Sequence, residues 1–164
     1  LPSRELRIWD VQTNQVRLAM PLEPSDMAGL NYIRVFGDHN HPTYGDALEQ
    51  YYQQGAPADW PTRFISAYAA MHPWEDFAET FAFYLDMVAV LDTALHMGLS
   101  RAEYDGSLES MLQAFHQVGL TVNELNRDMG LLDLAPGVLA PAVHEKLAYL
   151  HDLIQRANAS PKTA

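Results

Sequence analysis

The chain has 164 residues, of which 48% are apolar, and its 21 acidic and 10 basic residues give a formal charge of −11 at pH 7. This length and composition are typical of one globular domain, and the few scattered Lys and Arg exclude a basic surface for a nucleic-acid backbone. The absence of cysteine excludes disulfides and Cys-ligated zinc within these residues. There is no apolar run long enough to span a bilayer and no signal-peptide pattern in the first residues. We expect a soluble, cytoplasmic protein that binds neither nucleic acid nor membrane.

The N-terminal third of the chain predicts a little β structure followed by short helices. Residues 4–20, RELRIWDVQTNQVRLAM, alternate apolar and polar residues in two runs around Thr13-Asn14, which indicates a hairpin or two edge strands. Apolar residues then recur at helical spacing over 27–36 and again over 44–54. Gly- and Pro-containing loops follow each of these segments, so we expect two separate short helices.

The middle of the chain predicts a helix that ends before a proline and a longer one that starts at it. Pro61 suits the first turn of a helix over 61–71, because the amide that proline lacks would be unpaired there. Residues that precede a proline favour extended geometry, so this helix should stop before Pro73. A long helix should then run from Pro73 to Met97, with Gly98 as its C-terminal stop.

The C-terminal third predicts three more helices and a loop. One helix should run from Ser107 to Gly119, and the capping-box spacing of Thr121 and Glu124 predicts a separate short helix to Met129. The segment GLLDLAPGVLAP has too many Pro and Gly for regular structure, although its leucines suggest that it packs against the core. The last helix, over 141–157, carries an apolar stripe formed by Val143, Leu147, Leu150 and Ile154.

The segment HPWEDFAETFAFYLDM, residues 72–87, places Glu75 and Glu79 one turn apart on a shared face of the long helix. We expect that face to be bounded by aromatic side chains, namely Trp74, Phe77, Phe81 and Tyr84. One interpretation is a face that is solvated or paired with Lys or Arg. The other is a metal site, because zinc accepts a carboxylate as one of three protein ligands and a nearby second carboxylate can orient a ligating histidine. The spacing is compatible with both.

The seven histidines offer few alternative metal ligands. His39 and His41 of GDHNHP have the spacing of same-side residues on an extended segment, but a polar loop favours solvated histidines. His72 precedes the long helix, where a structural role such as capping is favoured over a place in the site. The rest are dispersed over different helices and are expected to be ordinary surface or core residues: His96, His116, His144 and His151.

Several stretches resemble one known family. FGD, ALEQYYQQGAPADW, FISAYAAMHPWEDFAETFAFYLDMV, LDTA and VNELNRDMGLLDL together are similar to a bacterial, zincin-like family of zinc-binding metallopeptidases, over residues 30–154. The resemblance implies a zincin-like fold. Together with the elements predicted along the chain, we expect a mainly α-helical (α+β) zincin-like domain over 1–157 with a small N-terminal β portion, followed by a polar tail over 158–164. It also implies zinc as cofactor, a peptide or protein substrate, and peptide-bond hydrolysis by metal-activated water.

The resemblance also assigns roles to three residues. In glutamate-zincins an HExxH helix supplies two zinc histidines and a general-base glutamate, and a later glutamate is the third ligand. Glu75 aligns with that ligand, and Glu79 aligns with the acid one turn on that orients a ligating histidine. Tyr68 matches a tyrosine that helps to stabilise the oxyanion in some zincins.

The chain departs from the family in three ways. No HExxH occurs in the 164 residues, and the Cys-bearing zinc ribbon that often precedes the domain is absent. Relatives commonly read AHYLH where this chain has AFYLD, so that Phe83 and Asp86 replace two histidines. The family would place HExxH shortly before FGD, near the abrupt junction Asp26-Met27.

Two explanations are open for the absent motif. Either the sequence omits a segment, or the protein is a non-catalytic relative that acts as a binding or scaffold module. If the two glutamates evolved around zinc, we expect the segment Pro21 to Gly29 to be poorly ordered without the metal, because metal binding and local order share one free energy.

Overall fold

The computed structural model describes residues 5–10, 15–21, 30–99 and 105–159 of the chain, and it is mainly helical. Two strands, β1 (Glu5–Asp10) and β2 (Gln15–Pro21), pair antiparallel with a register shift between Ile8 and Trp9. The turn at Thr13-Asn14 and the whole of 22–29 lie outside the described residues. Three predictions therefore concern residues that the structure does not describe. They are the start of a helix at Met27, the junction Asp26-Met27 and the poor order expected of this segment.

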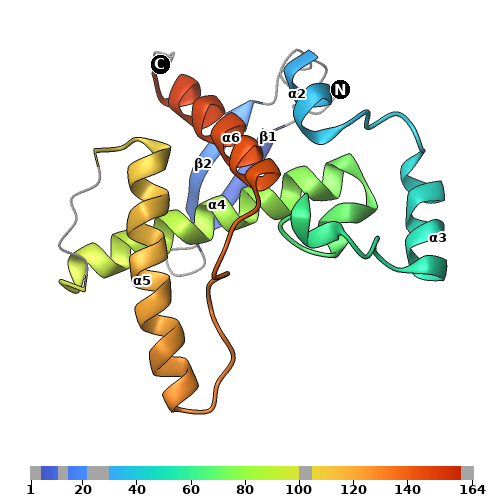
Figure 1. Ribbon diagram of the computed structural model, residues 1–164. Coiled ribbons are helices and arrows are strands. Elements are labelled where there is room, and N and C mark those ends of the chain that lie inside the picture. The colour runs from blue at the N-terminus through green and yellow to red at the C-terminus, as the bar shows by residue number, and fades with distance from the viewer. Residues whose placement is uncertain (1–4, 11–14, 22–29, 100–104, 160–164) are drawn as a thin grey trace.

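The helices are arranged around one long central helix (Figure 1). In chain order the helical elements are α2 (Leu30–Phe36), α3 (Tyr44–Gln54), the 3₁₀ turns η1 (Trp60–Thr62) and η2 (Tyr68–Met71), α4 (Pro73–His96), α5 (Leu108–Asp128) and α6 (Pro141–Ala159). α4 contacts α2, α5, α6 and η2, and α3 packs against η2. No helix in the described ranges is long and apolar enough to cross a membrane.

The core forms where α2, α5 and α6 meet the apolar face of α4. The predicted stripe of α6 is confirmed, since its four members are all buried: Val143, Leu147, Leu150 and Ile154. They pack with buried side chains of α4, among them Phe77, Phe81, Tyr84, Met87 and Leu91. Burial of this stripe holds α6 against the apolar face of α4. The two glutamates lie on the face of α4 that this packing does not use.

The sequence correctly predicts the bounds of α3 and α4. α4 begins at Pro73 and ends at His96, and Gly98 follows with φ 68°, a conformation that favours glycine. His72, just before Pro73, is extended with φ −157° and ψ 148°, as expected of a residue before proline.

The predicted helix over 61–71 is wrong. The segment forms only η1 and η2, with turns and bends between them. Ser66 gives the reason, because its Oγ accepts the backbone N–H of Ala69 at 3.0 Å. A serine side chain that bonds a nearby backbone amide competes with the helical hydrogen bonds at that point.

The predicted break at Gly119 is also wrong, since α5 continues from Leu108 to Asp128. Gly119 is buried in mid-helix, and a Cβ there would meet the Cβ of Ala135 at 2.8 Å. Its role is therefore to let the loop after α5 approach the helix closely. Thr121 donates its hydroxyl to the carbonyl of Gln117 at 3.0 Å within the helix, so no capping box forms there.

The loop between α5 and α6 packs against the core as expected, although only one of its four leucines, Leu139, takes part. Ala135 is buried in it and Leu139 is partly buried. The predicted leucines Leu131, Leu132 and Leu134 are exposed instead.

Candidate functional site

The first turns of α4 hold Glu75, whose half-buried carboxylate faces α3. The hydroxyl of Tyr44, the first residue of α3, donates to Glu75 Oε1 at 2.7 Å. This bond orients the carboxylate and connects α3 to α4. Tyr44 was missed in the sequence because it lies 31 residues from its partner and no local pattern marks the pair.

Tyr68 lies beside this pair, next to Tyr44. It begins η2, and its ring packs edge-on against Tyr51 of α3 with centroids 5.7 Å apart. The pKa of Tyr44 is raised above its usual range, first by the hydrogen bond to Glu75 and then by the neighbouring Tyr68 hydroxyl. The structure therefore brings Glu75, Tyr44 and Tyr68 together.

Glu79 lies one turn further along α4 and is also half-buried. Its Oε2 accepts the hydroxyl of Ser66 at 3.0 Å, which ties the segment before η2 to α4. Neither Glu75 nor Glu79 forms a salt bridge within the described ranges. The interpretation of a face paired with Lys or Arg therefore does not hold for this part of the chain.

The aromatic boundary predicted for the glutamate face is mostly wrong. Phe77, Phe81 and Tyr84 are buried in the core on the other side of α4. Their spacing from Glu75 puts them on the opposite helical face, because successive residues turn by about 100°. Of the two residues that replace histidines of the family pattern, Phe83 packs edge-on against Phe115 of α5 at 5.5 Å and Asp86 is exposed.

His72 has the capping role that the sequence favoured. It is buried, and its Nδ1 accepts the backbone N–H of Trp74 at 3.1 Å at the start of α4. Burial is the largest effect and lowers the pKa of His72, while the backbone of Pro42 and nearby Glu75 partly counteract it. His39 stacks on Trp74 with centroids 6.1 Å apart, and His41 is exposed.

The lowered pKa of His72 predicts a loss of stability in mild acid. Protonation favours the unfolded chain, so the free energy of unfolding should fall as pH drops below about 6.5, the ordinary histidine value. His72→Asn keeps a capping oxygen but does not titrate, so it should flatten this part of the pH profile. Urea unfolding of both proteins between pH 5 and pH 8 measures the difference, and identical profiles would remove His72 as the cause.

A buried ion pair lies next to the site. Asp76 follows Glu75 on α4, and its Oδ2 is 2.6 Å from Nζ of Lys146 on α6. Lys146 also donates to the carbonyl of Arg63 at 2.6 Å and lies 4.2 Å from the ring centroid of Phe64. Burial raises the pKa of Asp76 to about 6, while Lys146 counteracts the shift. This pair connects α6, α4 and the segment after η1 beneath the turn that carries Glu75.

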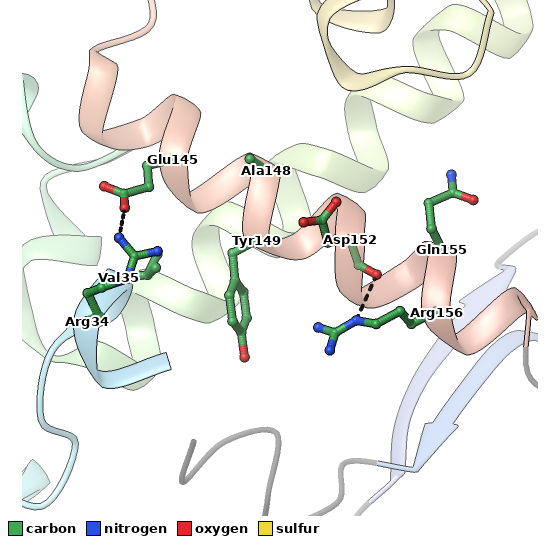
Figure 2. Close-up of a pocket in the computed structure, with 8 residues that line it drawn as sticks. All are labelled: Arg34, Val35, Glu145, Ala148, Tyr149, Asp152, Gln155 and Arg156. Atoms are coloured by element: carbon green, nitrogen blue, oxygen red, sulfur yellow. Dashed lines mark hydrogen bonds and ion pairs between the residues drawn. The ribbon is translucent and has the colours of Figure 1, made fainter. Parts of the chain in front are cut away.

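A separate hollow of about 550 Å³ lies between α2 and α6. Figure 2 shows Arg34 of α2 paired with Glu145 of α6, and Tyr149 and Arg156 further along α6. The walls carry charges of both signs, and the site glutamates Glu75 and Glu79 are not among them. It is therefore distinct from the glutamate face.

The described residues can be examined for the ligands that a zinc site needs. Within the described residues there is no group of three or more His, Cys, Asp and Glu side chains that could hold a metal ion. Structural and catalytic zinc sites need at least three protein ligands. The described residues therefore do not form a zinc site on their own, and Glu75 is the single ligand that the resemblance assigns to them.

The comparison with known proteins agrees with the resemblance. Residues 22–153 match the family described as "Putative zinc-binding metallo-peptidase". Uncharacterized proteins of Mycobacterium bovis and of two strains of Mycobacterium tuberculosis are each 38% identical to this chain over 131 residues. That alignment covers 75% of this chain but only 38% of each relative, so the chain spans well under half the length of these proteins. No solved structure matches the chain. Because the family match covers most of its length, the chain belongs to this family.

Proposed function

We propose that this protein is a zinc-dependent peptidase and that Glu75 is the metal ligand contributed by these residues. The observation that carries the proposal is a half-buried carboxylate, in a member of this family, that is held by a tyrosine hydroxyl and has no salt-bridge partner in the described ranges. A carboxylate that is held in one orientation and has no described Lys or Arg paired with it is suited to binding a metal ion.

The rest of such a site has to come from outside the 164 residues, because they contain no HExxH. A bound zinc ion supplies an activated water and polarises the peptide carbonyl of a peptide or protein substrate. Within this chain, Tyr44 orients Glu75, and Glu79 is placed one turn away, where it could orient a neighbouring ligand. Tyr68 is the candidate for stabilising the oxyanion, and its place beside Tyr44 supports that role.

The second candidate function is a binding or scaffold module that keeps the fold and has lost the metal. Two observations favour it: the sequence lacks HExxH, and the described part of the chain holds no group of three ligands. The departures at Phe83 and Asp86 also favour it, because these residues follow Glu79 by four and seven positions on the same helical face. In the structure Phe83 packs against Phe115 of α5 and Asp86 is exposed.

Intact mass and a peptidase assay separate the two functions. The protein purified at its natural length should exceed the 18.4 kDa of this chain, by at least roughly two to three kilodaltons for one further helix of up to about 20 residues. It should cleave unfolded protein substrates, and a zinc chelator should abolish that cleavage. A mass of 18.4 kDa together with no chelator-sensitive cleavage would reject the peptidase and leave the binding module.

A further inference from the structure

The helix α3 lies at the edge of the molecule and is joined to the rest by a loop on each side (Figure 1). Of the eleven described residues of α3, Ala47 alone is buried. The flanking loops, 37–43 and 55–59, are mostly exposed. By contrast, α4 and α5 each bury a row of apolar side chains along their length. α3 is therefore less firmly embedded than the helices that form the core.

Both ends of α3 are capped within its own segment. Thr43 Oγ1 accepts the backbone N–H of Asp46 at 3.3 Å, and the N–H of Gly55 donates to the carbonyl of Tyr51 at 2.8 Å. These caps do not depend on any other part of the molecule. A helix of this length is nevertheless only marginally stable by itself in water, so its contacts with the rest of the protein decide how often its amides are exposed.

Two tyrosines of α3 dock it onto the candidate site. Tyr44 donates its hydroxyl to Glu75 Oε1 at 2.7 Å, and its ring packs edge-on against His72 with centroids 5.3 Å apart. Tyr51 packs edge-on against Tyr68 of η2. The bond to Glu75 is part-buried and its acceptor is a carboxylate, and charge-assisted bonds of this kind are about twice as strong as neutral ones. The Tyr44 hydroxyl is therefore the strongest of these contacts.

We propose that α3 is a lid over the Glu75 carboxylate and that the Tyr44 hydroxyl is the latch that holds the lid closed. In the closed position Tyr44 occupies one oxygen of a half-buried carboxylate. Opening of α3 releases that oxygen and uncovers the first turn of α4, while the core between α4, α5 and α6 stays packed. The latch does not depend on zinc, whereas the role of the lid in controlling access to a peptidase site rests on the proposed function.

Hydrogen exchange of the purified protein without metal tests the latch. In the wild type the amides of α3 should exchange faster than those of α4, α5 and α6, because α3 opens locally while the core stays folded. Tyr44→Phe keeps the ring and removes the hydroxyl. It should accelerate exchange in α3 by about tenfold, the effect of losing one hydrogen bond to a charged group, and leave exchange in α5 and α6 unchanged.

Tyr52→Phe is the matched control, because Tyr52 lies on the same helix and is 76% exposed. It should leave exchange in α3 as it is in the wild type. An α3 that exchanges as slowly as α4 in the wild type would overturn the proposal. The same conclusion would follow if Tyr44→Phe left α3 unchanged, accelerated every helix equally, or had no more effect than Tyr52→Phe.

Carboxylate labelling with a carbodiimide and glycine ethyl ester, read by mass spectrometry, tests whether the lid covers Glu75. Glu75 should react several-fold faster in Tyr44→Phe than in the wild type. Glu79, which accepts from Ser66 instead, is the internal reference and should react equally in both proteins. Equal labelling of Glu75 in the two proteins would show that α3 does not cover it. Neither experiment contains zinc, so failure of the lid and failure of Glu75 as a metal ligand are separate results.

Discussion

Replacing Lys146 with methionine should lower the free energy of unfolding by about 3–5 kcal/mol, the range for removing one partner of a buried ion pair. The loss is large because Asp76 is only 1% exposed and would keep a carboxylate without its cation. The carbonyl of Arg63 would lose its donor as well. Urea denaturation at pH 7.5 measures the change.

The pH dependence of this loss follows from Asp76. Without Lys146 the folded-state pKa of Asp76 should rise further above its ordinary value, so the variant gains stability as pH falls and the carboxyl takes up a proton. The difference from wild type should therefore be smaller at pH 5 than at pH 7.5.

A matched double variant separates the unpaired charge from lost packing. Asp76→Leu combined with Lys146→Met replaces both charges with apolar groups, and such replacements are often neutral or stabilising. The double variant should therefore be more stable than Lys146→Met alone. A Lys146→Met protein within about 1 kcal/mol of wild type would show that the pair is not a buried, coupled unit.

Asn123→Ala should lower the free energy of unfolding by about 2–4 kcal/mol, since it leaves several buried backbone groups of the α5–α6 loop without partners. Asn123 is buried, and its three bonds to Leu134 and Ala135 hold that loop against α5. Hydrogen exchange of the loop amides should accelerate in the variant.

Asn126→Ala is the control for this substitution. Asn126 makes a single side-chain bond to the loop, to the carbonyl of Leu132, in an exposed position. Its loss should cost no more than about 1 kcal/mol. Equal effects of the two substitutions would mean that Asn123 does not hold the loop.

The sequence predicted the elements whose signals are local. Pro73 and Gly98 mark the ends of α4, and the spacing of Val143 and Leu147 marks the buried face of α6. The failures arose where distant contacts override a local signal. Gly119 is the usual residue of a helix stop, but here it admits Ala135 from a loop that comes 16 residues later.

The candidate site also divides into features that follow from local sequence and features that depend on distant contacts. The shared face of Glu75 and Glu79 follows from helical spacing, and family resemblance adds Tyr68. Their partners Tyr44 and Ser66 were not predicted, because those bonds exist only once α3 and the segment before η2 dock on α4. The phenylalanines were assigned to the glutamate face by proximity in sequence, whereas a residue two positions away lies on nearly the opposite side of a helix.

The central claim is that Glu75 binds zinc, and its control variants come from the same chain. Glu75→Gln keeps an oxygen that can accept the Tyr44 hydroxyl, so the melting temperature without metal should change little. Glu49→Gln removes an exposed carboxylate of α3, which accepts a hydrogen bond from Gln53, and should leave zinc binding intact.

Thermal unfolding of the protein at its natural length, with and without excess zinc, tests the claim most directly. Zinc that binds the folded state should raise the melting temperature of the wild type and of Glu49→Gln by mass action. Glu75→Gln should lose most of that rise, whereas equal zinc stabilisation of Glu75→Gln and wild type would show that Glu75 is not a ligand.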